Sequence, residues 1–243
     1  MTFPVRFQGV SHYFGKKKAL DDLNFEIEEN LITVIIGKSG SGKSTLLQII
    51  NGLIVPTEGK VYVFGKELDY NNIIQTRLKI GYAVQGTGLF PHMTVFENIS
   101  LLAKVSGSSS VEEIKDRIDE LMRFVNLNPD YKTKYPYQLS GGEQQRVGIC
   151  RAMVLNPGIF LLDEAFGALD PTTKNEIHLE LLNLQRHEPR TIVMVTHDLR
   201  EAEKLGDRIM IIDEGIIQQY EETGKVLNKP ANKIVEDFIN SQY

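Results

Sequence analysis

Cysteine is nearly absent from this chain, in which Cys150 is the only one among 243 residues. A single thiol excludes an internal disulfide and a zinc site built from several cysteines. Long apolar runs are absent as well, since no stretch reaches the roughly eighteen residues that a membrane-spanning helix needs. Residues 1–6 lack the basic-then-apolar pattern of a secretory signal. We therefore expect a soluble, cytoplasmic protein, which serves a membrane only if another chain crosses it.

An excess of positive charge is also missing, because 32 acidic residues outnumber 27 basic ones and give a net charge of −5. A nucleic-acid surface normally needs clustered lysine and arginine, so we expect no nucleic-acid partner. The hydrophobic fraction of 42% and the charged fraction of 24% are ordinary for a globular domain. This length and composition suffice to bury the core of one α/β unit, with room for a subdomain.

Apolar runs that alternate with helical segments indicate an α/β fold. Residues 31–36 form a β-branched run that ends in glycine, and we expect a helix over residues 43–51 after it. Two further apolar runs, residues 159–162 and 191–195, lead into polar residues and are separated by an expected helix over residues 172–185. This alternation is typical of parallel βαβ units. Shorter strands are expected over residues 5–9, 24–28 and 59–65, with Asp21 and Asp22 in the connection between the first two.

The middle of the chain indicates helices. Residues 110–113, Ser-Val-Glu-Glu, fit a capping box, in which the serine and the glutamate satisfy free N–H groups at a helix start. Apolar residues follow at helical spacing, namely Ile114, Ile118, Leu121, Met122 and Val125. We therefore expect a single domain, in which a helical subdomain over residues 86–150 interrupts a core formed by residues 1–85 and 151–225. Residues 226–243 are expected to form a short, amphipathic helical tail.

Residues 37–44, Gly-Lys-Ser-Gly-Ser-Gly-Lys-Ser, match the phosphate-binding pattern G-x-x-x-x-G-K-[ST]. The loop follows an expected strand and precedes an expected helix, where successive N–H groups and the helix N-terminus bind anions. Lys43 supplies a cation for the β- and γ-phosphates, and Ser44 supplies a hydroxyl for Mg²⁺. The alternative is a flexible Gly/Ser turn, which this context disfavours. The expected nucleotide contacts are Gly37, Lys38, Ser39, Gly40, Ser41, Gly42, Lys43, Ser44 and Thr45.

Polar residues also follow the two other apolar runs. Asp163 ends the run over residues 159–162, where P-loop ATPases carry a carboxylate that orders magnesium. Glu164 beside it is the candidate that polarises an attacking water. Taken alone, such a pair is more often a solvated strand end, and the phosphate loop upstream changes that interpretation. His197 follows the run over residues 191–195 and is either a structural or exposed histidine or a donor to the γ-phosphate.

Residues 139–146, Leu-Ser-Gly-Gly-Glu-Gln-Gln-Arg, complete a set of three motifs. In order and spacing, residues 37–44, residues 139–146 and the pair Asp163-Glu164 resemble the Walker A, signature and Walker B motifs of ABC transporter ATPase subunits. The resemblance covers about residues 5–224. It implies an α/β P-loop NTPase core with a mainly parallel sheet, an N-terminal antiparallel β subdomain and an inserted α-helical subdomain. It also implies ATP and Mg²⁺ as cofactors, and ATP hydrolysis that is coupled to transport.

The resemblance assigns roles to further short motifs. Gln85 is similar to the Q-loop glutamine, which touches Mg²⁺ and the water, so the metal would lie at Ser44, Gln85 and Asp163. Residues 168–170, Ala-Leu-Asp, resemble the D-loop at the dimer interface, and His197 resembles the switch histidine. The catalytic residues implied are Lys43, Gln85, Glu164 and His197.

Adenine binding is implied for an aromatic residue near the N-terminus. Phe14, directly before Gly15, lies where the family stacks an aromatic ring on adenine. Tyr13 is the adjacent competitor, and Phe14 is favoured.

The signature segment has a physical interpretation as a site completed by a second chain. Ser140 can cap the helix that begins there, and the two glycines after it bring bare N–H groups close to a γ-phosphate. Because the chain's own phosphate loop already holds one side of its nucleotide, we expect this helix end to serve the ATP of a second subunit. The resemblance implies that the two subunits form a head-to-tail dimer around two ATP. The alternative is a plain Ser-Gly-Gly turn that caps a helix. The residues expected to contact that nucleotide are Ser140, Gly141, Gly142, Glu143 and Asp170.

Residues 88–98 follow the Q-loop and, in the family, line the groove that receives a coupling helix of the membrane subunit. Their apolar side chains would dock there, although they could equally be subdomain core. This segment and residues 165–170 resemble importer subunits, and segments 205–209 and 231–239 add a likeness to importers of glycine betaine, choline and related quaternary amines. The resemblance implies a homodimer, permease subunits, an extracytoplasmic solute-binding protein and a location on the inner face of the cell membrane. An exporter subunit and an ABC ATPase outside transport are the alternatives.

Two departures from the family pattern are visible. Ala165 follows Glu164 where many relatives carry proline, and we expect little loss because alanine keeps the backbone possibilities open. Those importers often carry a C-terminal pair of regulatory domains, which this sequence lacks, so we do not expect osmotic or ionic gating through this subunit.

Overall fold

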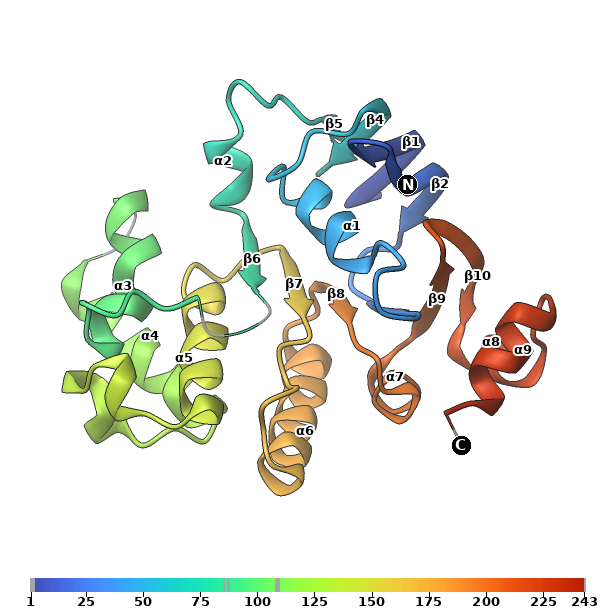
Figure 1. The fold of residues 1–243 in the computed structure, drawn as a ribbon. Helices are drawn as coiled ribbons and strands as arrows, with labels where there is room; N and C mark the ends of the chain where they lie inside the picture. Colours follow the sequence, from blue (N-terminus) through green and yellow to red (C-terminus); the bar gives the residue numbers. More distant parts are fainter. Residues whose placement is uncertain (1–2, 85, 87, 108–109, 243) are drawn as a thin grey trace. The chain divides into compact units, whose positions relative to one another are not determined.

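The computed structural model describes residues 3–84, 86, 88–107 and 110–242, and Gln85 lies outside this set (Figure 1). The chain forms two compact units. Unit 1 joins the residues up to Arg77 with those from Arg190 onward, and unit 2 runs from Leu78 to Pro189. None of the helices in the described ranges is both long enough and apolar enough to span a bilayer.

Unit 1 contains an antiparallel sheet of strand order β2-β1-β4-β5 and a mainly parallel group of order β10-β9-β3-β8. In the second group β3 is parallel to both β8 and β9, and β10 is antiparallel to β9. All five residues of β3 and of β8 are buried, as the unbroken apolar runs predict. The strands are β1 (Val5–Phe14), β2 (Lys17–Ile27), β3 (Ile32–Ile36), β4 (Glu58–Val63), β5 (Lys66–Glu67), β8 (Thr191–Val195), β9 (Arg208–Asp213) and β10 (Ile216–Glu222).

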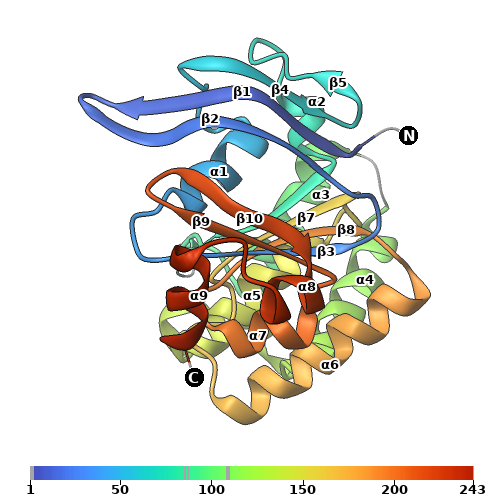
Figure 2. The same cartoon turned by 90° about the vertical axis from the view of Figure 1, so that its right-hand side faces the viewer.

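The helices of unit 1 include the predicted helix after the phosphate loop and the predicted helical tail. The helix after the loop is α1, and the tail forms α8 and α9, which pack against β10 (Figure 2). Val235, Phe238 and Ile239 of α9 are buried, which confirms its amphipathic character. The helices are α1 (Lys43–Ile50), α2 (Ile74–Arg77), α7 (Leu199–Leu205), α8 (Thr223–Asn228) and α9 (Lys233–Asn240).

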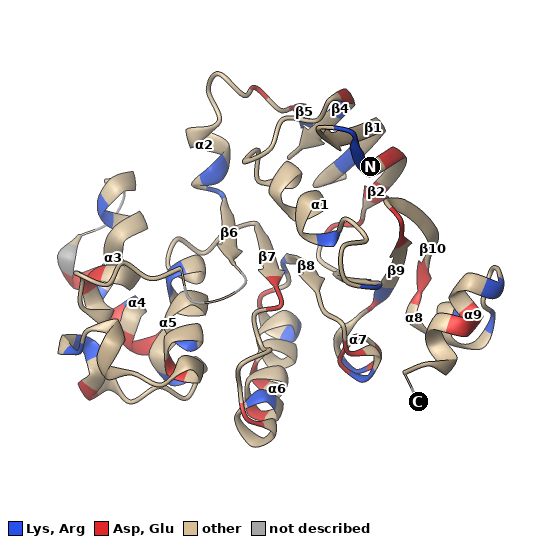
Figure 3. Ribbon diagram, viewed as in Figure 1, with Lys and Arg blue, Asp and Glu red and all other residues tan. Residues whose placement is uncertain are grey.

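Unit 2 combines a parallel strand pair with helices. Strand β6 pairs with β7, and α5 packs against β6, α3 and α4. The capping box over residues 110–113 is confirmed, and the apolar residues predicted after it are buried. Helix α6 carries both acidic and basic residues along its length (Figure 3). The elements are β6 (Ile80–Ala83), α3 (Val95–Ser106), α4 (Val111–Phe124), the 3₁₀ helices η1 (Pro129–Thr133) and η2 (Pro136–Gln138), α5 (Gly141–Met153), β7 (Ile159–Asp163) and α6 (Pro171–His187).

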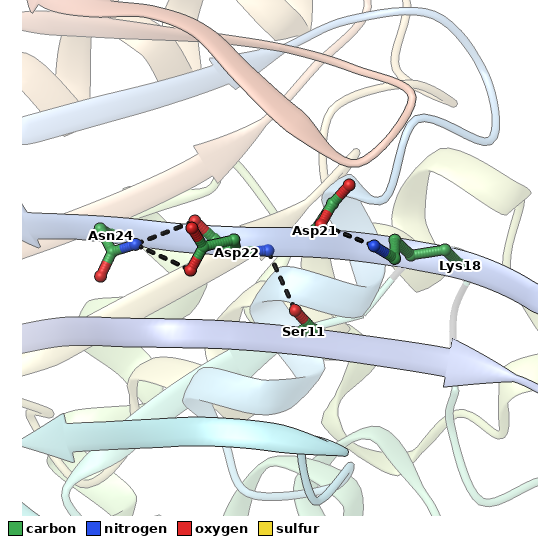
Figure 4. Close-up of polar contacts among 5 residues, drawn as sticks. All are labelled: Ser11, Lys18, Asp21, Asp22 and Asn24. Atoms are coloured by element: carbon green, nitrogen blue, oxygen red, sulfur yellow. Dashed lines mark hydrogen bonds and ion pairs between the residues drawn. The ribbon is translucent and has the colours of Figure 1, made fainter.

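The β1–β2 hairpin is longer than predicted, and the expectation that Asp21 and Asp22 lie in a connection is wrong. Both lie inside β2, where Ser11 faces the two of them between the pairs Val10–Leu23 and His12–Leu20. This two-against-one arrangement is a β-bulge, and Asp22 adopts a left-handed φ of 46°. Side chains supply the missing ladder bonds. The Asp22 amide donates to Ser11 Oγ at 3.0 Å, and Asn24 Nδ2 donates to the Asp22 carbonyl at 3.0 Å (Figure 4).

Candidate active site

The phosphate loop joins β3 to α1 in unit 1, and two of its glycines are required by close backbone contacts. A Cβ added to Gly37 would lie 2.0 Å from the carbonyl oxygen of Ile212. A Cβ added to Gly42 would lie 2.5 Å from the carbonyl oxygen of Ala19, and its φ is +105°. Any side chain at these positions would displace the backbone of β9 or β2, so the loop conformation depends on glycine.

Lys43 lies beneath the loop rather than outside it. Its side chain is only 6% exposed, and its Nζ donates to the carbonyl oxygens of Gly37 and Lys38, at 2.8 Å each. The loop therefore wraps around a buried ammonium group, which adds a full positive charge to the partial charge of the helix end.

The start of α1 differs from the starts of six other helices and shares its lack of a side-chain cap with the short helix α8. A side-chain oxygen caps α3, α4, α5, α6, α7 and α9, whereas α1 begins at Gly42 without a side-chain cap and has no acidic residue in its first turn. Free N–H groups at a helix N-terminus are the usual ligands of phosphate. The uncapped start of α1 thus has the chemistry of an anion site.

A pocket of about 520 Å³ opens beside the loop, entirely within unit 1. The β1–β2 hairpin contributes Lys17 and Lys18 to its wall, and the β9–β10 turn contributes Asp213 and Glu214. The Lys18 ammonium is paired with Asp21 Oδ1 at 2.7 Å (Figure 4). The remaining lining residues are Lys38, Ser39, Gly40 and Ser41.

The two aromatic candidates for adenine differ in their surroundings. Phe14 is 53% exposed at the end of β1, and the His12 ring packs nearly perpendicular to its ring, with 4.7 Å between the ring centroids. Tyr13 is less exposed, and the ammonium of Lys18 lies 5.3 Å from its ring centroid. The greater exposure of Phe14 favours it over Tyr13 as the residue that stacks on a base.

His197 lies at the same sheet edge as the phosphate loop. Strands β3 and β8 are parallel with Ile35 opposite Val195, so Gly37 and His197 each follow directly beyond the carboxyl ends of neighbouring strands. The Thr196 amide donates to the Ile35 carbonyl at 3.2 Å, and the Asp198 amide donates to Thr196 Oγ1 at 3.1 Å. The exposed His197 side chain is thereby held on a fixed backbone at this edge.

The carboxylate pair lies in unit 2, at the end of β7. Asp163 is 3% exposed, and the Tyr82 hydroxyl from β6 donates to its Oδ2 at 3.2 Å. Burial, and then the charge of Asp163, raise the pKa of Tyr82, so this hydroxyl stays a donor. Glu164 follows the last residue of the strand with a left-handed φ of 48°, and the residue is partly exposed.

The signature segment forms the start of α5 as predicted. Ser140 Oγ accepts the Glu143 amide at 3.3 Å, and Glu143 Oε2 accepts the Ser140 amide at 2.7 Å, which completes a capping box. The two glycines differ. A Cβ added to Gly141 would meet nothing within 4 Å, whereas one added to Gly142 would lie 3.3 Å from the Ala168 carbonyl. Gly141 is therefore open to the surface, and Gly142 packs on the chain's own D-loop segment.

Asp170 caps α6. Its Oδ1 accepts the Thr173 amide at 3.0 Å, and the hydrogen bonds from Thr173 lower the pKa of Asp170. Asp170 thus caps the helix that follows residues 168–170.

The segment over residues 88–98 contains both a buried side chain, as expected of subdomain core, and an exposed aromatic one, as expected of a docking surface. Asn98 is fully buried, and its side chain binds the Phe90 amide at 2.8 Å and the Met93 carbonyl at 3.0 Å. Phe90 itself is 41% exposed and packs edge-on against His92. A buried amide therefore holds a loop that exposes an aromatic side chain.

Sequence reasoning missed two residues that hold the site, Tyr82 and Gln145. Gln145 is 5% exposed, and its amide binds the backbone of Glu164 and of Ala168. Its position four residues before the buried Ile149 places it on the inner face of α5. A polar residue on a buried helix face needs hydrogen-bond partners. The position of Gln145 among the buried residues of α5 was therefore the signal in the sequence that it binds another part of the chain.

Comparison with known proteins identifies related chains over most of this length. A family model described as ABC transporter matches residues 20–167. The carnitine transport ATP-binding protein OpuCA of Listeria monocytogenes is 44% identical over 236 residues, which cover 97% of this chain and 59% of the relative. The glycine betaine uptake system ATP-binding protein YehX of Escherichia coli is 42% identical over 97% of this chain and 76% of its own length. The chain thus spans about three fifths of OpuCA.

Solved structures share the fold. The dimeric structure of MJ0796, a bacterial ABC transporter cassette, has a TM-score of 0.85 and 37% identity, over 90% of this chain and 98% of that one. A second dimeric MJ0796 structure, a post-hydrolysis state bound to ADP and Pi, gives the same values. The predicted fold class is confirmed, with a mainly parallel core, an N-terminal antiparallel β subdomain and a helical region.

Proposed function

The chain belongs to the ABC transporter family, and we propose that it is the subunit that binds and hydrolyses ATP to drive transport through partner membrane subunits. The observation that carries the proposal is the uncapped start of α1 over the buried Lys43 ammonium. Backbone N–H groups and a fixed cation together are what the β- and γ-phosphates of a nucleotide require. The nucleotide contacts proposed are those predicted over residues 37–45, with Phe14 stacked on adenine.

Magnesium would bind to oxygen donors of this chain together with the phosphates. Mg²⁺ prefers one or two carboxylates, hydroxyls and phosphate oxygens, and the described residues hold no cluster of three metal-binding side chains. The Ser44 hydroxyl in the first turn of α1 and the buried Asp163 carboxylate fit this chemistry. We assign them as metal ligands together with Gln85, and the bound ion would neutralise developing phosphate charge.

Glu164 would polarise the attacking water, and His197 would donate a ring N–H to the γ-phosphate. Glu164 lies directly after the buried strand and is partly exposed, so its carboxylate is accessible to water, which supports this role. The exposed His197 on a fixed strand end supports its role as well.

The start of α5 would complete the site of a second identical chain. The exposed Ser140 cap and the open space at Gly141 support this assignment, because a phosphate can approach that helix end without displacing a side chain. Gly142, Glu143 and Asp170 would complete the same contact surface. The two subunits would then enclose two ATP molecules between them, as in a head-to-tail dimer.

The solute proposed is a quaternary amine, taken up by an importer. Support comes from relatives whose names specify carnitine, glycine betaine and choline transport, at 42–44% identity. The partners proposed are permease subunits and, through them, an extracytoplasmic solute-binding protein, so this chain would lie on the inner face of the cell membrane.

Uptake of labelled betaine, carnitine and choline by cells that lack the protein tests the solute. We expect uptake of at least one to fall and to return with the wild-type chain but not with Glu164→Gln. Unchanged uptake of all three, with loss of another solute, would contradict the quaternary-amine assignment. Co-purification from gently solubilised membranes tests the partners, and recovery of a permease with a solute-binding protein is the result expected for an importer.

A further inference from the structure

Gln145 makes two hydrogen bonds that join α5 to the loop after β7. Its Nε2 donates to the carbonyl oxygen of Glu164 at 3.1 Å, and its Oε1 accepts the amide of Ala168 at 3.0 Å. The side chain is 5% exposed, so water does not compete for these bonds. One amide group thus closes both ends of the segment from Glu164 to Ala168.

The Glu164 backbone depends on such contacts. Its φ of 48° is disfavoured for a residue with a Cβ, so the conformation persists only where neighbouring groups fix it. Within the loop, the Gly167 amide also donates to the Glu164 carbonyl, at 3.1 Å. Gln145 supplies the contact from outside the loop, and the direction of the Glu164 carboxylate follows from the backbone so held.

The same helix turn is fixed to the D-loop. A Cβ added to Gly142 would lie only 3.3 Å from the Ala168 carbonyl, so the first turn of α5 and the D-loop are in close contact. Ser140 caps this turn. The Ser140 end of α5 and the Glu164 loop are therefore parts of one packed assembly within unit 2.

We propose that Gln145 is a positioning residue, which sets the Glu164 carboxylate and links it to the helix start that contacts the ATP of the second subunit. The inference rests on the proposed function, because it concerns the hydrolysis assigned to Glu164. A glutamine suits this role because a single side chain must both donate to a carbonyl and accept an N–H. Methionine fills the same space with neither bond, and glutamate keeps only the acceptor.

Unit 1 offers a matched control for the loss of such a pair of bonds. Gln219 Nε2 donates to the Lys229 carbonyl at 3.1 Å, and its Oε1 accepts the Ala231 amide at 2.9 Å. Gln219→Met and Gln219→Glu therefore remove the same chemistry from the connection between α8 and α9, which has no proposed part in ATP hydrolysis.

The test compares steady-state ATPase kinetics of the purified chain and its variants. We expect Gln145→Met to lower kcat by about 10- to 100-fold while KM for ATP changes by less than about twofold, because the phosphate loop is untouched. Gln145→Glu, the milder variant, should also lower kcat, since it cannot donate to the Glu164 carbonyl. Both Gln219 variants should keep the wild-type kcat.

A double-variant cycle distinguishes positioning from general loosening. If Gln145 acts through Glu164, then Gln145→Met/Glu164→Gln should be no slower than Glu164→Gln alone. Three results would overturn the proposal. One is a kcat within twofold of wild type for both Gln145 variants. The others are a fall in kcat for the Gln219 variants as large as that for the Gln145 variants, and a double variant slower than Glu164→Gln by the full effect of Gln145→Met. A different result would refute the proposed function, and the role of Gln145 with it. That result is a wild-type chain with no ATPase activity, or with an ATPase activity that Glu164→Gln does not reduce.

Discussion

The phosphate loop of unit 1 and the Glu164 loop of unit 2 are held in different ways. In the phosphate loop, Lys43 binds carbonyl groups of its own loop, and Gly37 and Gly42 allow backbone contacts with the neighbouring strands. In the Glu164 loop, a side chain 19 residues away, that of Gln145, binds the backbone. The first loop therefore carries most of its structural determinants in its own motif, and the second depends on the identity of a residue on another element.

Among the variants, Glu164→Gln should have the largest effect on the ATPase rate, and it should act on the hydrolysis step assigned to the second loop. We expect kcat to fall by about 10²- to 10⁴-fold, the usual contribution of a general base, while ATP affinity stays within about threefold. Steady-state turnover and equilibrium binding of labelled ATP measure the two quantities. Glu180→Gln, which neutralises an exposed carboxylate on α6, is the control. Wild-type turnover in Glu164→Gln would show that another group activates the water.

Gly42→Ala should disrupt the first loop through its backbone. The left-handed φ and the contact with the Ala19 carbonyl together should lower the free energy of unfolding by about 2–4 kcal/mol. Urea unfolding without nucleotide measures this loss. Gly107→Ala shares a left-handed φ but meets no atom within 4 Å, so it should cost only about 1 kcal/mol. Equal losses would mean that the close contact of Gly42 is unimportant.

Lys43→Ala should affect binding instead of the chemical step. Removal of a charged donor to the phosphates should weaken ATP binding by about 10- to 100-fold. Isothermal titration with ATP measures the change, and Lys66→Ala, at an exposed lysine on β5, is the control. Unchanged affinity would refute the assignment of the loop as the phosphate site, whatever the effect on turnover.

The capping serines of α4 and α5 provide the smallest effect and a direct comparison. Ser110 and Ser140 form the same capping box, so Ser110→Ala and Ser140→Ala should each lower the free energy of unfolding by about 1 kcal/mol. Only Ser140→Ala should also lower the ATPase rate, because only that helix start is proposed to contact a nucleotide. Equal ATPase rates for the two variants would mean that Ser140 only caps its helix and has no part in nucleotide binding.

The elements that could be predicted from the sequence are those whose determinants are local. The β-branched run over residues 31–36, the glycine and lysine spacing of the phosphate loop and the capping box at Ser110 each act over a few residues, and each appears in the structure. The position of Asp163 and His197 at strand ends follows from the apolar runs before them.

Long-range contacts could not be predicted in this way. The bulge that keeps Asp21 and Asp22 inside β2 depends on Ser11 of the neighbouring strand. The tie between Gln145 and the Glu164 loop likewise depends on tertiary packing, and the different environments of Gly141 and Gly142 follow from the position of Ala168. A motif identifies these residues as a group but does not say which neighbour each one contacts.

Sedimentation of Glu164→Gln with ATP, alone and combined with Ser140→Arg, tests the central claim most directly, namely that a second copy of the chain completes the ATP site. The account predicts that Glu164→Gln sediments as a dimer with ATP and as a monomer without it. It also predicts that Glu164→Gln/Ser140→Arg binds ATP but stays a monomer, because the arginine fills the space at the start of α5. A double variant that dimerises with ATP, or a Glu164→Gln chain that binds ATP and stays a monomer, would contradict it.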